Sequence, residues 1–106
     1  MTLKHDYSGK GYDCNKIKKR GYEEEFLTSL HYDMLRIRRI EEEIERRYHE
    51  DEMKSPIHLV IGQEATSVGA CAALRQQDLV YCGHRTHGHY LAKGGSLKKM
   101  MSELYC

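Results

Sequence analysis

One long stretch without glycine or proline, from Tyr22 to Ser55, constrains the fold more than any other feature of the chain. Apolar side chains recur through it at spacings of three or four residues: Phe26, Leu30, Met34, Ile37, Ile40, Ile44 and Tyr48. This spacing predicts a single long amphipathic helix. Pro56 is the only proline in the chain, and it disfavours helical backbone at the residue before it. We therefore expect the helix to end near Ser55.

The other faces of this helix carry charges of both signs. Arginines and glutamates between Arg36 and Arg47 lie three or four residues apart, a pattern typical of a solvated helix face. In the whole chain, 17 Lys and Arg oppose 16 Asp and Glu, which gives a net charge of +1. A nucleic-acid surface would need the arginines to be unopposed. The charge pattern thus disfavours both nucleic acid and an anionic membrane as partners.

Small residues dominate the segment that follows Gly62. Its members are Ala65, Val68, Gly69, Ala70, Cys71, Ala72, Ala73 and Leu74. Because small side chains let other backbones approach closely, we expect a helix that is buried in a larger assembly.

The last third of the chain predicts a strand and a further helix. The apolar run from Leu79 to Cys82 is interpreted as a short buried strand. Ser96 is suited to cap a last helix. Its apolar face comprises Leu97, Met100, Met101 and Leu104.

The ends and the length of the chain bound its organisation. With 106 residues there is room for one small domain, which we place at residues 22–106 after a flexible basic leader, residues 1–21. No apolar run is long enough to span a bilayer, and the first residues lack the apolar core of a signal peptide. A cytoplasmic location is expected, or the mitochondrial matrix for a eukaryotic source, although no clear transit peptide is present. The four cysteines are expected to be free thiols.

The most ligand-like segment follows the expected strand and contains His84, His87 and His89. Arg85 lies in the same segment, between two glycines, where its planar guanidinium could hold a phosphate with two hydrogen bonds. An alternative is that the histidines only cover a polar loop. A zinc site that also uses Cys82 is less favoured, because structural zinc sites usually combine ligand pairs from separate turns.

Three residues upstream are ambiguous when taken alone. His58 stands beside an apolar run, where a histidine is more often a hydrogen-bonded core residue than a catalyst. Gln63 and Glu64 stand at the start of the small-residue helix, and local stabilisation of its positive end explains them without catalysis.

Four motifs, in this order along the chain, carry a resemblance to a known family: LRIRRIEEEI, SPIHLVIGQEATSVGACAAL, DLVYCGHRTHGHYLAKGG and MMSELYC. From about Phe26 to Tyr105 the chain resembles the alpha subunit of the first component of 2-oxo acid dehydrogenase complexes. The sequence HRTHGHYLAKGG is most similar to the acetoin dehydrogenases and bacterial pyruvate dehydrogenases of this family. These enzymes use thiamine diphosphate.

The resemblance implies roles for particular residues. His58 would line the active site as a catalytic and cofactor-binding residue. His84 and Arg85 would bind the cofactor, with Arg85 on the diphosphate, although many relatives have Tyr in place of His84. Gln63 and Glu64 would serve packing and subunit contact.

The resemblance also implies a fold and an activity. The fold class would be α/β, with this chain as the amino-terminal, mostly helical piece of a doubly wound parallel-sheet fold. The activity would be oxidative decarboxylation of a pyruvate-like 2-oxo acid, or cleavage of acetoin, with transfer of the acyl group to a lipoyl group. The partners would be a beta subunit and a lipoyl-bearing acyltransferase.

The motif that holds magnesium in the family, a Gly-Asp-Gly sequence with a downstream Asn, has no counterpart in these 106 residues. We therefore expect a truncated dehydrogenase domain that is inactive by itself. The alternative is a small non-catalytic helical module that binds a partner protein.

Overall fold

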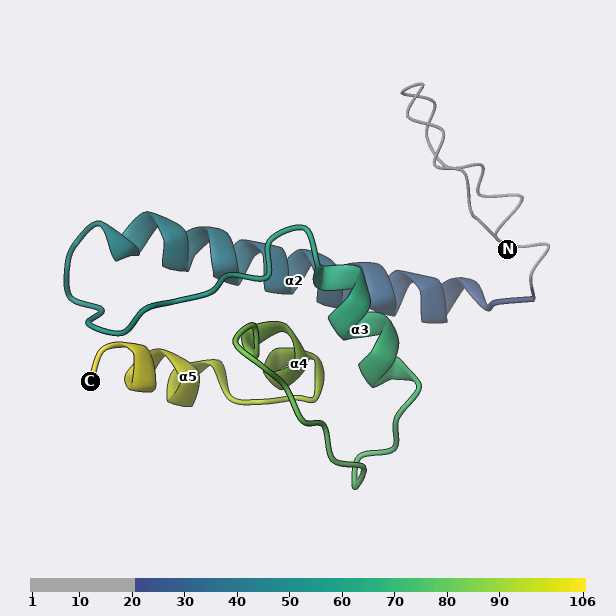
Figure 1. Ribbon diagram of the computed structural model, residues 1–106. Coiled ribbons are helices and arrows are strands. Elements are labelled where there is room, and N and C mark those ends of the chain that lie inside the picture. The colour runs from purple at the N-terminus through teal and green to yellow at the C-terminus, as the bar shows by residue number, and fades with distance from the viewer. Residues whose placement is uncertain (1–20) are drawn as a thin grey trace.

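The computed structural model describes residues 21–106, and this part of the chain is helical (Figure 1). Its elements are α2 (Glu24–Tyr48), α3 (Glu64–Ala72), α4 (His87–Ala92) and α5 (Leu97–Leu104). The expected leader, residues 1–21, falls outside the described residues apart from Gly21. Within residues 21–106 no helix is both long and apolar enough to cross a membrane.

Helix α2 is the long amphipathic helix expected from the apolar spacing, but it is shorter at its C-terminal end. It stops at Tyr48 rather than near Ser55. The chain turns at Asp51, whose φ of 56° lies in the left-handed region, and Met53 then packs into the core with 3% of its surface exposed. The burial of Met53 thus takes the chain off the helix axis well before Pro56.

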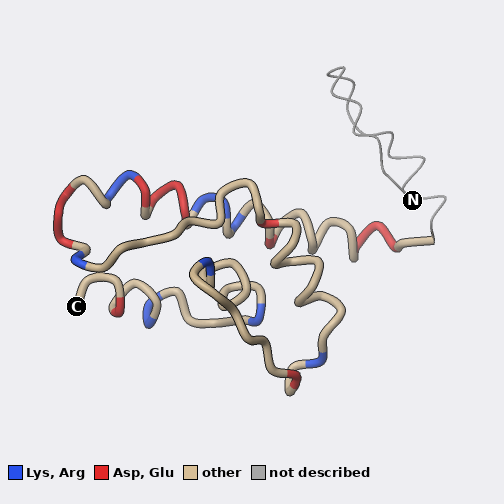
Figure 2. The backbone as a smooth tube through the Cα atoms, in the orientation of Figure 1, with Lys and Arg blue, Asp and Glu red and all other residues tan. Residues whose placement is uncertain are grey.

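The charged faces of α2 form the expected ion pairs. Arg39 bonds Glu42 at 3.1 Å, and both Arg46 and Arg47 bond Glu43, at 2.7 and 2.6 Å. Figure 2 shows the alternation of acidic and basic residues along this helix. Such exposed pairs each add little stability, which fits the solvated face that the charge pattern predicts.

The core lies where α3, α4 and α5 approach the apolar face of α2. Helix α3 packs against both α2 and α4. The buried apolar residues are Ile37, Ile44, Met53, Val60, Val68, Leu91, Met100 and Leu104. Helix α3 buries Val68 and Cys71 but leaves Gly69, Ala70 and Ala72 exposed, so residues 21–106 cover one face of the small-residue helix and leave the other uncovered.

The expected strand from Leu79 to Cys82 is wrong for this chain. These residues form no strand, and Leu79 and Tyr81 are 79% and 91% exposed. A strand needs a neighbour to pair its backbone N–H and C=O groups, and nothing in residues 21–106 adopts a strand that could provide it. The helical character of the piece is confirmed, whereas residues 21–106 form no strand of the expected parallel sheet, and the doubly wound fold stays a prediction.

The expected last helix is confirmed as α5. Its cap is Ser96, whose Oγ accepts a hydrogen bond from the Lys99 amide at 3.4 Å. Met100 and Leu104 are buried, and Leu97 at the start of the face is 38% exposed. Helix α5 therefore closes one end of the core below α2 (Figure 1).

Candidate functional site

Two histidines that are 26 residues apart in the sequence lie side by side on the surface. The ring centroids of His58 and His84 are 5.4 Å apart, and the rings are tilted by 46°. His58 comes from the extended segment before α3, and His84 comes from the loop before α4. Both side chains are exposed, so His58 is not the hydrogen-bonded core residue that its neighbours alone would favour.

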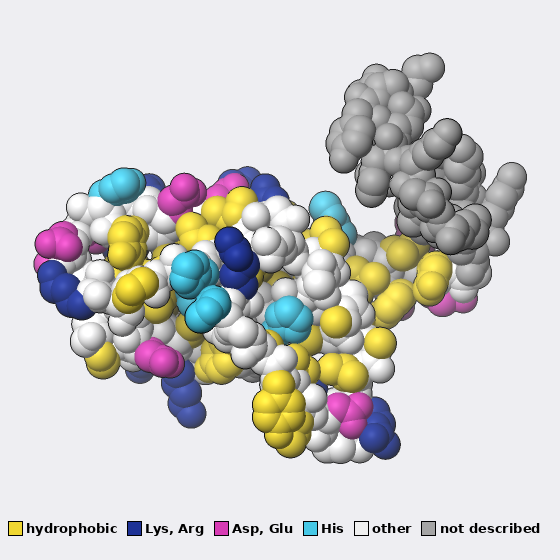
Figure 3. All heavy atoms as spheres, viewed as in Figure 1, with side chains coloured by type: hydrophobic (Ala, Val, Ile, Leu, Met, Phe, Trp, Pro, Cys, Tyr) yellow, Lys and Arg dark blue, Asp and Glu magenta, His cyan; other side chains and the backbone are white. Residues whose placement is uncertain are grey.

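Arg85 is anchored to the segment that carries His58. Its Nε donates a hydrogen bond to the carbonyl oxygen of Leu59 at 3.0 Å. This bond does not use the two terminal guanidinium nitrogens, and the side chain is exposed. Figure 3 shows histidine side chains gathered beside a basic side chain near the middle of one face. The three residues expected to bind a cofactor are thus brought to one surface.

A buried carboxylate lies behind this surface. Glu41 of α2 is 0% exposed. One of its oxygens is 2.7 Å from Nδ1 of His87, and the other accepts a hydrogen bond from the Val60 amide at 2.8 Å. The charge pattern predicts that Glu41 lies on the solvated face, and this prediction is wrong. Its position four residues after Ile37 and three before Ile44 places it on the apolar face, and this signal could have found it.

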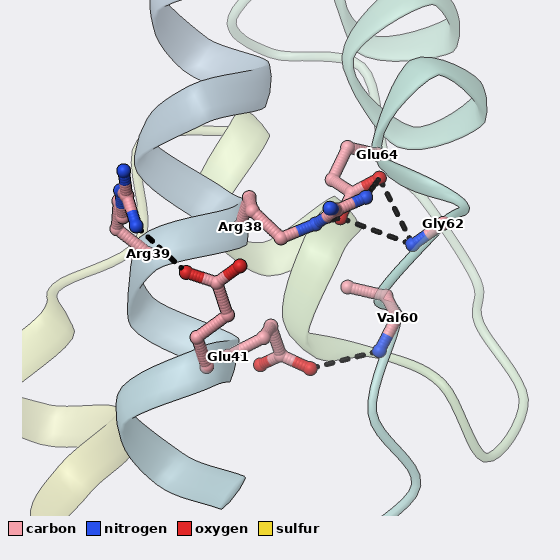
Figure 4. A network of polar contacts seen from close by, with 7 residues as sticks. Arg38, Arg39, Glu41, Val60, Gly62 and Glu64 are labelled. Carbon is pink, nitrogen blue, oxygen red and sulfur yellow. Dashed lines mark hydrogen bonds and ion pairs between the residues drawn. The ribbon is translucent and has the colours of Figure 1, made fainter. Parts of the chain in front are cut away.

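A second carboxylate joins α2 to the start of α3. Arg38 donates to the two carboxylate oxygens of Glu64 at 2.5 and 3.2 Å, and the Gly62 amide donates to the same carboxylate (Figure 4). Hydrogen bonding from Arg38, opposed by partial burial and aided by the Gly62 amide, lowers the pKa of Glu64. Glu64 therefore makes a tertiary contact in addition to any effect on its own helix, whereas Gln63 is exposed.

The two histidines of α4, His87 and His89, face the interior instead of the Arg85 surface. His87 reaches Glu41, and Nδ1 of His89 is 3.4 Å from Oγ of Ser67. Cys82 is an exposed free thiol. Between Gly21 and Cys106 no three His, Cys, Asp or Glu side chains are grouped closely enough to hold a metal ion. The described part of the chain thus gives no support for the zinc alternative.

The chemistry of the exposed surface suits an anion. The terminal guanidinium nitrogens of Arg85 bond no other residue of the described part of the chain, so they can form paired hydrogen bonds to phosphate oxygens, and imidazole N–H groups can add further donors. The donor set therefore fits a diphosphate group.

Comparison with known proteins identifies a family. Residues 32–106 match the family model described as "Dehydrogenase E1 component". The chain is 35% identical over 91 residues to the alpha subunit of acetoin:2,6-dichlorophenolindophenol oxidoreductase from Bacillus subtilis, which covers 84% of this chain and 27% of that protein. It is 46% identical over 72 residues to the pyruvate dehydrogenase E1 component subunit alpha of Rhizobium meliloti, which covers 68% of this chain and 21% of that protein.

The pyruvate dehydrogenase E1 component subunit alpha of Zymomonas mobilis is 44% identical over 81 residues, 76% of this chain and 23% of that protein. The chain thus spans about a quarter of the length of these relatives. No solved structure gives a significant match.

Proposed function

Because the chain belongs to the dehydrogenase E1 component family, we propose that it supplies part of the thiamine diphosphate site of an E1 alpha subunit. Enzymes of this family use thiamine diphosphate. One observation carries the proposal: the hydrogen bond from Arg85 Nε to the Leu59 carbonyl joins the His84–Arg85 loop to the segment that holds His58. This bond sets a cation beside two imidazoles on an exposed surface.

Each residue has a role that follows from its chemistry. Arg85 binds the diphosphate through its two terminal nitrogens, because a planar fork matches two phosphate oxygens. His84 lies beside it as a second hydrogen-bond donor. His58 lies beside His84 on the same exposed surface, and we assign it the catalytic role among the three.

In the complete enzyme, the bound cofactor supplies the electron sink that makes decarboxylation possible, while the protein positions the reactants. We propose oxidative decarboxylation of a pyruvate-like 2-oxo acid, or cleavage of acetoin, with the acyl group passed to a lipoyl-bearing acyltransferase. A beta subunit completes the site. Residues 22–106 act as the amino-terminal part of the dehydrogenase domain, and residues 1–21 precede it.

The described residues bring together no cluster of three or more side chains that could ligate a metal ion. The 106-residue chain is proposed to be inactive by itself, because it spans about a quarter of the length of its relatives. Its activity is expected only where the remaining three quarters of an alpha subunit and a beta subunit are present.

A hybrid subunit tests the proposal. Residues 32–106 would replace the matching segment of the Bacillus subtilis relative, which would be produced together with its own beta subunit. Reduction of dichlorophenolindophenol with acetoin or pyruvate, dependent on added thiamine diphosphate, is the expected result for the hybrid. The isolated chain should show none. A hybrid that assembles but shows no such activity would favour the interaction-module alternative.

A further inference from the structure

The side chain of Glu41 connects the two segments that carry the proposed site. One carboxylate oxygen accepts from the Val60 amide, two residues after His58. The other contacts His87, two residues after Arg85. Both bonds originate from a single side chain that is fully buried on α2.

The position of this carboxylate in the structure requires both partners. A buried carboxylate is costly unless its oxygens are hydrogen-bonded, and here each oxygen has a partner from a different segment. Figure 4 shows the Glu41 side chain leaving α2 and reaching the Val60 backbone. Movement of either segment would therefore leave one oxygen of a buried carboxylate without a partner.

We propose that Glu41 is a positioning residue, whose carboxylate fixes the Val60 segment against the start of α4 so that His58, His84 and Arg85 present one anion-binding surface. This inference rests on the proposed function for the identity of the anion. The geometric part, that Glu41 holds the two segments in register, is independent of it. The bond from Arg85 to Leu59 spans the same two segments and depends on the same register.

The experiment compares variants of the 106-residue chain in solution by nuclear magnetic resonance. The first readout is cross-relaxation between the His58 and His84 rings, whose centroids lie 5.4 Å apart. The second readout is hydrogen exchange of the Val60 amide. The third is the dissociation constant for inorganic pyrophosphate, measured by calorimetry.

Glu41→Ala should abolish the ring contact and expose the Val60 amide to exchange. It should also weaken pyrophosphate binding by about tenfold or more, because a charge-assisted contact is no longer held in place. Glu41→Gln should retain most of the three readouts. Its amide oxygen still accepts from Val60, and its NH₂ group can donate to Nδ1 of a neutral His87 imidazole. His87→Ala should lose the ring contact while the Val60 amide stays protected, because only half of the connection is broken.

Two controls separate positioning from general stability. Ile44→Val removes one methyl group from the core one turn along α2, and it should lower the unfolding temperature without changing the ring contact or pyrophosphate affinity. Glu45→Ala removes an exposed carboxylate from the same helix and should change none of the readouts. If Glu41→Ala does not fold, His87→Ala is the variant expected to lose the ring contact, and Glu41→Gln is the variant expected to keep it.

The proposal is overturned if the ring contact persists in Glu41→Ala or His87→Ala, if Ile44→Val loses it equally, or if the unchanged chain lacks it. The outcome is distinguishable from failure of the proposed function. If the unchanged chain does not bind pyrophosphate, but the Glu41→Ala variant loses the ring contact, the proposed function is contradicted and the positioning role is supported. If the unchanged chain and Glu41→Ala bind pyrophosphate with the same dissociation constant, the proposed function is supported and the positioning role is contradicted.

Discussion

Gly88 at the start of α4 lies directly against Ser67 of α3. A Cβ atom at Gly88 would lie 3.0 Å from the Ser67 Cβ, closer still to its Oγ, and 3.3 Å from Cγ2 of Val60. Ser67 and Val60 are 2% and 1% exposed, so neither can move aside into solvent. The absence of a side chain at Gly88 therefore sets how closely α4, and the His84–Arg85 loop before it, approaches α3.

Gly88→Ala should destabilise the chain by about 1 to 3 kcal/mol, because overpacking forces neighbouring atoms to shift. Urea unfolding monitored by circular dichroism measures this. Gly69→Ala is the matched control: Gly69 lies in α3 with nothing within 4 Å of its added Cβ, and alanine there should stabilise by about 0.5 to 1 kcal/mol. Ser67→Gly combined with Gly88→Ala should recover part of the loss. Equal effects of the two alanine variants would refute the close-packing account.

Glu64→Ala should lower the unfolding free energy by about 1 to 3 kcal/mol, since it removes a largely buried carboxylate that accepts from Arg38 and Gly62. Glu43→Ala is the comparison. Glu43 also bonds two arginines, but on an exposed face of α2, where water and salt screen the pairs. Urea titration should show a much smaller change for Glu43→Ala, and an equal change would mean that burial adds nothing to the Arg38–Glu64 pair.

The same contact predicts a loss of stability in acid. Hydrogen bonding from Arg38 holds the pKa of Glu64 below its ordinary value of 4.5 in the folded chain. Its contribution is therefore present above about pH 4.5 and is lost as the pH falls through the lowered pKa. Hydrogen bonds from Arg46 and Arg47 likewise lower the pKa of Glu43 to about 2, but its exposure reduces the effect on stability.

Thermal unfolding between pH 2 and 6 should show a falling midpoint in the unchanged chain and a shallower fall in Glu64→Gln, which cannot titrate. Parallel curves for the two proteins would contradict the assignment of this acid dependence to Glu64.

The cysteines should differ in reactivity. Burial raises the pKa of the Cys71 thiol, and only 8% of this residue is exposed, whereas Cys82 and Cys106 lie on the surface. Since the thiolate is the reactive form, iodoacetamide at pH 8 should modify Cys82 and Cys106 well before Cys71. Peptide mass mapping follows each cysteine separately. Addition of urea should remove the difference, and rapid labelling of Cys71 without urea would contradict its place between α3 and α4.

The sequence predicted the helices more accurately than their surroundings. Apolar spacing identified the long helix and the face buried by Met100 and Leu104, because local periodicity reflects which side of a helix is covered. The apolar run at Leu79–Cys82 predicted a strand, because such runs are typical of buried strands. An apolar run becomes a buried strand only where partner strands are present. The structure provides none among residues 21–106.

The candidate site was predicted in part. His58, His84 and Arg85 were chosen by resemblance, and the structure brings them together, while their roles stay a prediction. The charge pattern does not single out Glu41, because a glutamate among many charged residues is typical of a solvated face, yet Glu41 lies on the apolar face. Long-range pairs such as Glu41 with His87, 46 residues apart, depend on how helices pack and are not visible in local spacing.

The binding of thiamine diphosphate by Arg85 variants of the hybrid subunit, measured by calorimetry, tests the central claim most directly. A charge-assisted contact is typically worth about 1.5 to 3 kcal/mol, so Arg85→Ala should raise the dissociation constant by roughly tenfold to a hundredfold. Arg85→Lys should recover only part, because a point charge cannot reproduce the planar fork. Arg75→Ala, which removes an exposed arginine paired with Asp78, should leave the affinity unchanged. An unchanged dissociation constant in a folded Arg85→Ala hybrid would contradict the proposed site.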